Sequence, residues 1–254
     1  GSILLRGNRL RYFMGGNEGV TYNVWLSDSP SPLSPGTADP TGFQPPVTAR
    51  TLVTSGATPA SPEGWIPDGV NETLGNNVDA HLDLDADNLP DLPRPQGSPY
   101  RVFDFPIDLA MPPDTYRDAA VVQAFYIMNE AHDRLYALGF DEASGNFQTD
   151  NFGLGGLGGD AVSLDCQDGS GTSNANWSGD PDDGTDARIQ MYVFDDTTPH
   201  RDGGLDAELG YHEYAHGLSF RLVADFSFIQ DQPGSMGEGW SDFFAIALTA
   251  EPVD

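Results

Sequence analysis

Apolar residues recur every three to four positions between residues 114 and 138, and this rhythm predicts a long helix. Asp114 is expected to cap the start of the helix, and Gly139 is expected to end it. The apolar positions form a broad face that would pack into a core: Ala119, Val122, Phe125, Tyr126, Met128, Ala131, Leu135 and Leu138.

Alternation of apolar and polar side chains predicts strands elsewhere in the chain. It runs from Arg188 to Phe194, with Ile189, Met191 and Val193 on the inner face. A weaker alternation between Arg9 and Trp25 predicts one or two more strands, and the residues from 27 to 46 are rich in Ser, Pro and Gly, as in a connector. These patterns favour an α+β protein, with a loop-rich, β-containing region over residues 1–112 and a second unit over residues 113–254.

A second helical rhythm surrounds the motif His212-Glu213-Tyr214-Ala215-His216, which reads H-E-x-x-H. Asp206 is a suitable N-cap, so we expect this helix over about residues 206–223. Two histidines four residues apart lie on one helix face, where both imidazoles can bind one zinc ion. Glu213 could then take a proton from a water held by the metal. The alternative interpretation is a surface helix with two solvated histidines.

A catalytic zinc ion usually takes three protein ligands, and the best third candidate lies in the segment GEGWSD. Glu238 and Asp242 are four residues apart and share a face of a helix predicted over about residues 236–250. Glu238 would bind the metal, and Asp242 would accept the ring N–H of a ligand histidine. A solvated acidic helix start is the alternative, but carboxylates on such an apolar helix need a partner.

The stretch HEYAHGLS followed by GEGWSD resembles the fungalysin family of secreted zinc metalloendopeptidases, within the thermolysin-like group. The resemblance extends over roughly residues 75–242 and includes the segments GNNVDAHLDLDADN and QDGSGTSNANW. It implies a zincin fold with a β-rich, irregular N-terminal lobe, a long zinc-binding helix and only the start of the helical C-terminal lobe. It also implies that Asn174 and Ala175 hold the substrate backbone, that Glu213 is the catalytic base, and that one Zn²⁺ is bound by His212, His216 and Glu238.

The resemblance implies a secreted, extracellular endopeptidase that hydrolyses internal bonds of protein or peptide substrates through a zinc-activated water. The chain ends at Asp254, however, 16 residues after Glu238 (254 − 238). In the family, later helices supply the oxyanion donors and would cover the apolar face of the Trp240–Ala250 helix, which comprises Phe243, Phe244, Ile246 and Leu248. Two alternatives take account of this end: a non-catalytic zinc-binding fragment, and half of a two-chain enzyme that needs a C-terminal partner. A third alternative concerns the substrate, namely a zinc hydrolase that acts on something other than peptides.

The composition excludes some partners. The formal net charge is −28, and such a surface repels other anions, so we expect neither nucleic acid nor an anionic membrane surface to bind. The 11 basic residues are all arginine. No run of 18 apolar residues occurs that could span a bilayer. Cys166 is the single cysteine, so no intrachain disulfide can form. Two alternatives explain the acidic composition without lysine: adaptation to salty or extracellular surroundings, or the codon bias of a GC-rich genome.

A candidate calcium loop lies in the segment HLDLDADNLPD. Asp83, Asp85, Asp87 and Asp91 have the one-three-five-nine spacing of a calcium-binding loop. Asn88 occupies the sixth place, where glycine is usual, and it can adopt a left-handed turn. The glutamate of the twelfth place is absent, so a solvated acidic turn is the alternative to Ca²⁺.

Overall fold

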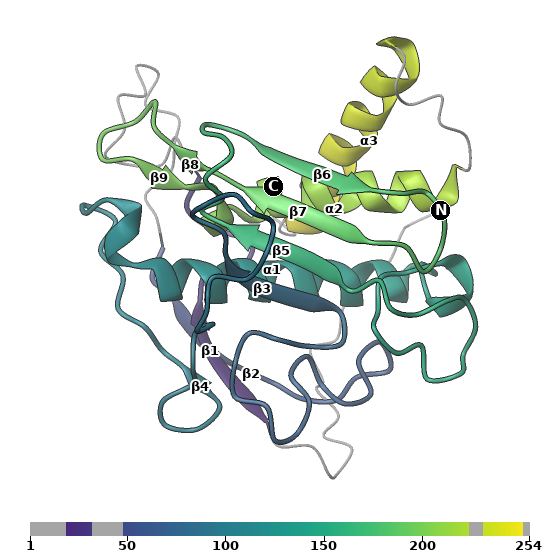
Figure 1. Ribbon diagram of the computed structural model, residues 1–254, viewed down its shortest axis with the longest axis horizontal. Helices are drawn as coiled ribbons and strands as arrows, with labels where there is room; N and C mark the ends of the chain where they lie inside the picture. The colour runs from purple at the N-terminus through teal and green to yellow at the C-terminus, as the bar shows by residue number, and fades with distance from the viewer. Residues whose placement is uncertain (1–18, 32–47, 224–230, 251–254) are drawn as a thin grey trace.

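The computed structural model describes residues 19–31, 48–223 and 231–250, without the side chains of residues 231 and 232. Within these ranges the chain forms a mixed α+β architecture of helices and short strands (Figure 1), which confirms the predicted class. The predicted strands between residues 9 and 18 and most of the connector over residues 27–46 lie outside the described residues.

A long helix, α1 (Arg117–Ala137), lies between two sheets (Figure 1). The smaller sheet has the order β2-β1-β4, with bounds Thr51–Ser55, Val20–Val24 and Val102–Phe103. The larger sheet has the order β3-β5-β7-β6, with bounds Val78–Leu82, Val162–Cys166, Ala187–Met191 and Ala175–Gly179. Its first three strands are parallel, whereas β6 runs antiparallel to β7 and forms an edge of the sheet.

Helix α1 is buried around most of its circumference, because both sheets and helix α2 (Ala207–Leu222) pack against it. The predicted buried position of Leu138 is wrong, since this residue is 54% exposed at the C-terminal end. Gly139 ends the helix as predicted, with a φ of +105°. The predicted cap at Asp114 is also wrong: Asp114 lies in a separate 3-10 turn, and α1 begins after Tyr116 without a side-chain cap. The proline at position 113 suits the start of that short turn.

The strand predicted over Arg188–Phe194 is divided at Tyr192. Ile189 and Met191 are buried in β7 as expected, but the chain then changes its partner. Val193 and Phe194 form β8 (Val193–Phe194), which pairs with β9 (Arg201–Asp202) instead of β6. At the division the main-chain carbonyl of Tyr192 accepts the N–H of Gly203, so pairing with the segment before α2 overrides the local alternation.

The start of helix α2 is capped from two sides. The Asp206 side chain accepts the main-chain N–H groups of Glu208 and Leu209, which confirms its predicted role as the N-cap. The hydroxyl oxygen of Ser29 accepts the N–H of Ala207 at 2.7 Å. These contacts satisfy three of the N–H groups that a helix start leaves free, and they fix α2 to the N-terminal segment.

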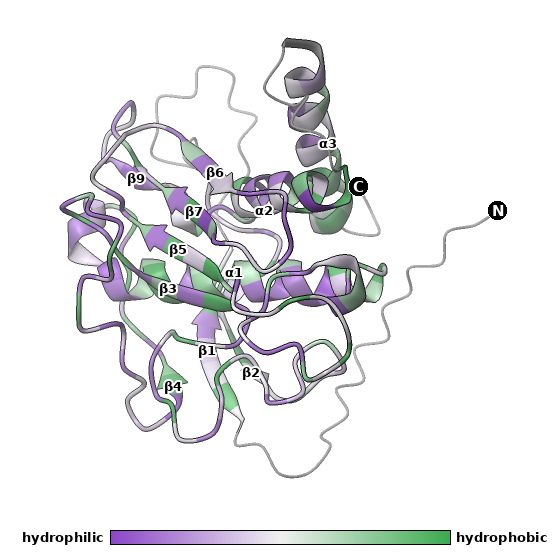
Figure 2. Cartoon of the chain, turned by 45° about the vertical axis from the view of Figure 1, so that its right-hand side comes forward, coloured by the Kyte–Doolittle hydropathy of each residue, from purple (hydrophilic) through white to green (hydrophobic). Residues whose placement is uncertain are grey.

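Helix α3 (Asp231–Thr249) packs against α2 and extends away from the two sheets, with its more hydrophobic half next to α2 (Figure 2). Ser241 and Ala245 are buried on its inner face. Phe244 and Leu248 also pack partly buried against the main core, so the expectation that they are exposed is wrong. Phe243 and Ile246 do face outward, with 64% and 61% of their surface exposed.

One main hydrophobic cluster draws its members from β1 through α3, on both sides of the boundary predicted at residue 112. The division into two units therefore stays a prediction. Among the described helices, none is long and apolar enough to cross a membrane. Cys166 is buried in β5 with a free thiol.

Candidate active site

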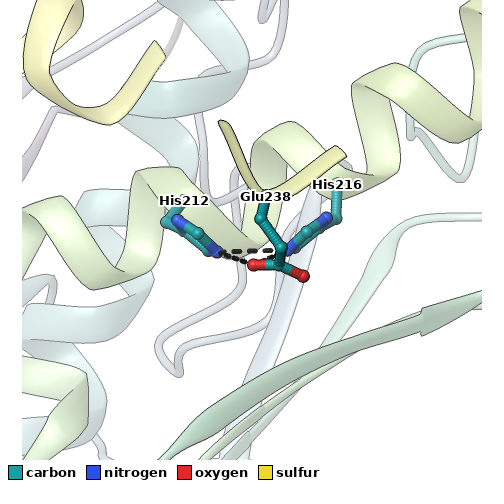
Figure 3. Close-up of side chains that lie close together, drawn as sticks. All are labelled: His212, His216 and Glu238. Atoms are coloured by element: carbon teal, nitrogen blue, oxygen red, sulfur yellow. Dashed lines mark hydrogen bonds and ion pairs between the residues drawn. The ribbon is translucent and has the colours of Figure 1, made fainter. Parts of the chain in front are cut away.

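Two helices bring His212, His216 and Glu238 together (Figure 3). The histidines lie one turn apart on α2, and their Nε2 atoms are 3.1 Å from each other. Oε2 of Glu238, on α3, lies 3.1 Å from Nε2 of His212 and 3.5 Å from Nε2 of His216. Thus three potential ligand atoms, two imidazole nitrogens and one carboxylate oxygen, face a common point.

Asp242 contacts the far side of one of these rings. Its Oδ1 atom lies 2.9 Å from Nδ1 of His212, so the carboxylate can accept the ring N–H and leave Nε2 as a free electron-pair donor. Asp242 and Glu238 both reach His212 from one face of α3, as their spacing of four residues predicts.

Glu213 lies on α2 between the two histidines and is only 5% exposed. Burial raises the pKa of its carboxyl group to about 7, whereas the nearby His212 and the N–H of Trp177 act to lower it. The side chain lines the same cleft as the three potential ligands. A carboxylate in this place can exchange protons with a group bound in the cleft.

The cleft has a volume of about 760 Å³ and lies between edge strand β6 and helices α2 and α3. Ala175, the first residue of β6, and Asn174 directly before it line the cleft, and their contact with a substrate main chain stays a prediction. Asn174 is exposed, and its carbonyl accepts the N–H of Tyr192, whereas Ala175 is buried. Because β6 is paired only with β7 among the described strands, its free edge is available for another extended chain.

The contact between Trp177 and Gly217 is not evident from the sequence pattern. A Cβ atom at position 217 would lie 2.6–2.8 Å from three atoms of the Trp177 ring, so the glycine lets β6 approach α2 closely. The centre of the Phe147 ring lies 5.0 Å from that of Trp177 and packs against it. Both Trp177 and Gly217 stand inside recognisable motifs, but their contact joins residues 40 positions apart (217 − 177).

The structure brings together three of the four candidate calcium ligands. Carboxylate oxygens of Asp83, Asp85 and Asp87 lie within 4.8 Å of one another, and Asn88 has the left-handed conformation predicted for it, with a φ of 60°. Asp91 is not part of this group; its carboxylate accepts the N–H of Leu84 at 2.8 Å. Calcium binding stays a prediction.

Comparison with known proteins identifies similar sequences. The family model described as Fungalysin metallopeptidase (M36) matches residues 37–254. "Extracellular metalloproteinase" from Pyrenophora tritici-repentis is 40% identical over 261 aligned positions, covering 98% of this chain and 37% of that protein. "Probable extracellular metalloproteinase 4" from Arthroderma benhamiae is 43% identical over 199 residues, covering 76% of this chain. "Extracellular metalloproteinase MEP" from Pyricularia oryzae is 44% identical over 208 residues. The chain spans 30% to 37% of the length of these three relatives.

Proposed function

This chain belongs to the fungalysin metallopeptidase (M36) family, and we propose that it forms the catalytic zinc centre of a secreted endopeptidase. Its substrates would be protein or peptide chains cleaved at internal bonds. The names of the relatives, which describe extracellular metalloproteinases, support both the reaction class and secretion.

The observation that carries the proposal is the convergence of His212, His216 and Glu238. In a tetrahedral zinc site with bonds of about 2.0–2.1 Å, neighbouring ligand atoms lie roughly 3.3–3.4 Å apart. The separations of 3.1, 3.1 and 3.5 Å fall on both sides of this value. Two imidazoles and one carboxylate are also a donor set that zinc takes in peptidases. These three residues would therefore hold the zinc ion.

The protein groups would divide the work of hydrolysis among them. When bound, zinc supplies a Lewis acid that polarises the scissile carbonyl and makes the attacking water more acidic. Glu213 would accept a proton from that water as the water oxygen bonds to the carbonyl carbon, and would then deliver the proton to the leaving amine as the C–N bond breaks. Asp242 would hold the tautomer and orientation of His212 through the contact at Nδ1.

The edge of β6 would align the substrate. An extended peptide can add to a free sheet edge through main-chain hydrogen bonds, with alternate side chains directed into the cleft. Asn174 and Ala175 would hold the substrate main chain here, beside Glu213. This placement would put a scissile bond next to the base through main-chain contacts alone or together with side-chain contacts in the cleft.

We also propose the thermolysin-like zincin arrangement, in which a second, helical lobe closes the other side of the cleft. Phe243 and Ile246 on the outer face of α3 are the groups that such a lobe, or a separate C-terminal partner, would cover. An oxyanion donor would come from the same polypeptide. Calcium at the Asp83–Asp87 loop is a further candidate cofactor.

The test is an assay of the complete protein on an unfolded protein and on peptides with blocked ends. We expect cleavage of internal bonds, loss of activity with a zinc chelator and recovery on addition of zinc. Stoichiometric zinc without turnover would favour the non-catalytic alternative. Chelator-sensitive hydrolysis of esters, with none of peptides, would favour a different zinc hydrolase.

A further inference from the structure

The side chain of Arg134, on α1, contacts both α2 and α3. From α1, its Nη1 group donates a hydrogen bond to the main-chain carbonyl of Leu248 on α3. Its guanidinium carbon lies 5.6 Å from the centre of the Tyr211 ring on α2, directly before His212. Glu130, one turn earlier on α1, accepts from Nε at 3.2 Å and orients the guanidinium group. One cation therefore contacts both helices that carry the candidate zinc ligands.

The carbonyl group of Leu248 lies at the C-terminal end of its helix, where a hydrogen bond must come from outside the helix. Helix α3 ends at Thr249, and the last four carbonyls of a helix have no partner within the helix. The last turn of α3 contains no basic residue. Arg134 therefore supplies, from α1, the hydrogen bond and the positive charge that stabilise the C-terminal end of α3.

Both site carboxylates on α3 belong to exposed side chains, N-terminal to the contact with Arg134. The side chains of Glu238 and Asp242 are 63% and 67% exposed, and among the described residues no neighbouring group lies within 4 Å of where a Cβ of Gly239 would be. The buried positions of α3 are small residues at intervals of four: Gly237, Ser241, Ala245 and Thr249. Small side chains let α3 approach α2 closely, and its larger packed side chains, Phe244 and Leu248, lie C-terminal to both carboxylates.

We propose that Arg134 is a positioning residue of the metal centre, which sets the angle at which α3 presents Glu238 to the two histidines. This role rests on the zinc site proposed above. Glu238 lies ten residues before Leu248 on α3, or about 15 Å along the helix axis. A tilt of about 5° at the C-terminal end moves Glu238 by roughly 1 Å over that length. Zinc ligands must lie within about 0.2 Å of their ideal bond lengths, so a tilt of this size weakens binding.

The experiment measures zinc affinity by competition with a chromophoric chelator, using the full chain. Arg134→Gln should bind zinc at least about tenfold more weakly, the range seen for partners of metal ligands. Arg134→Lys should recover most of the loss, because an ammonium group can still donate to Leu248. Arg94→Gln is the matched control, since it removes an ion pair to Asp79 at the opposite edge of the larger sheet. It should lower stability without changing zinc affinity.

A double-mutant cycle separates positioning of Glu238 from a general loss of stability. In a Glu238→Ala background, Arg134→Gln should have no further effect on zinc affinity. An equal loss in that background, or wild-type affinity in Arg134→Gln itself, would overturn the role. If Arg134→Gln does not fold, Arg134→Met retains the aliphatic stem and takes its place. A wild-type chain that binds no zinc, or a His216→Ala variant that binds it equally well, would instead reject the zinc site.

Discussion

The Nδ1 atom of His212 lies 2.9 Å from Oδ1 of Asp242, across the interface between α2 and α3. This contact fixes which nitrogen of His212 carries a proton and which one faces Glu238 and His216. It also joins the same two helices that the candidate zinc ligands join, so orientation of the ligand and helix packing depend on one pair of side chains.

Replacement of Asp242 should weaken zinc binding without preventing it. We expect Asp242→Ala to lower zinc affinity about 10- to 100-fold, because His212 loses the acceptor that orients its ring. Asp242→Asn should lose less, since an amide oxygen can still accept the ring N–H. Competition with a chelator measures both variants, and wild-type affinity in Asp242→Ala would contradict the orienting role.

Glu213→Gln should retain zinc and lose turnover. The amide preserves the shape of the side chain but cannot accept a proton, so we expect activity of the complete enzyme to fall by a factor of about 10²–10⁴. Glu208 on the same helix lines the same cleft and is exposed. Glu208→Gln is thus the matched control, and its activity should stay within a few fold of the wild type. Substantial activity in Glu213→Gln would show that Glu213 is only structural.

The local features of the site could be predicted from the sequence because they depend on short spacings. Asp206 caps α2 as expected, and the four-residue intervals place His212 with His216 and Glu238 with Asp242. The meeting of the two pairs is a tertiary contact. Spacing within each helix does not determine it, and its prediction rests on the need of a catalytic zinc ion for a third protein ligand, together with the family resemblance.

The predictions that were wrong concern places where a partner distant in the sequence determines the local structure. Tyr192 ends β7 because the next residues pair with β9, and Phe244 turns inward because α3 packs on α2. In each of these places the pattern along the chain is compatible with more than one set of neighbours.

Two glycines in helices should respond in opposite ways to alanine. At Gly217 a Cβ atom would lie 2.6 Å from the Trp177 ring, so Gly217→Ala should destabilise the fold by about 1–3 kcal/mol. At Gly239 no described residue would contact the added Cβ atom, and Gly239→Ala should stabilise α3 by about 0.5–1 kcal/mol. Urea unfolding of both variants tests the difference. If both variants gain stability, β6 can move away from α2 at little cost.

The charge of −28 predicts that added salt stabilises the chain. Repulsion among carboxylates acts over a screening length of about 30 Å at 0.01 M salt and about 3 Å at 1 M. We therefore expect the melting temperature to rise over this range in sodium or potassium chloride. Sucrose is the control, since it stabilises folded proteins without screening charge. A melting temperature that does not change with salt would favour genome composition as the origin of the lysine-free sequence.

Asp202 should make stability depend on pH. Burial raises the pKa of its carboxyl group to about 6, although hydrogen bonds from Gln167 and the N–H of Gly204 act to lower it. The folded state therefore keeps a proton that the unfolded chain releases near pH 4, the ordinary range of an aspartate. The stability from this group is fully present below about pH 4 and is lost as the pH rises through about 6.

Asp202→Asn removes this titration, so the comparison with the wild type isolates it. The wild type should lose stability between pH 4.5 and pH 7.5 as Asp202 ionises, and the variant should not. The difference in free energy of unfolding, variant minus wild type, should therefore rise by about 1–3 kcal/mol over this range. Urea unfolding at both pH values measures the change. The constant loss of one hydrogen bond in the variant cancels in this comparison, because it does not vary with pH. A difference that stays the same across the range would mean that Asp202 is already ionised in the folded protein below pH 4.5, with its charge held by Gln167 and Gly204.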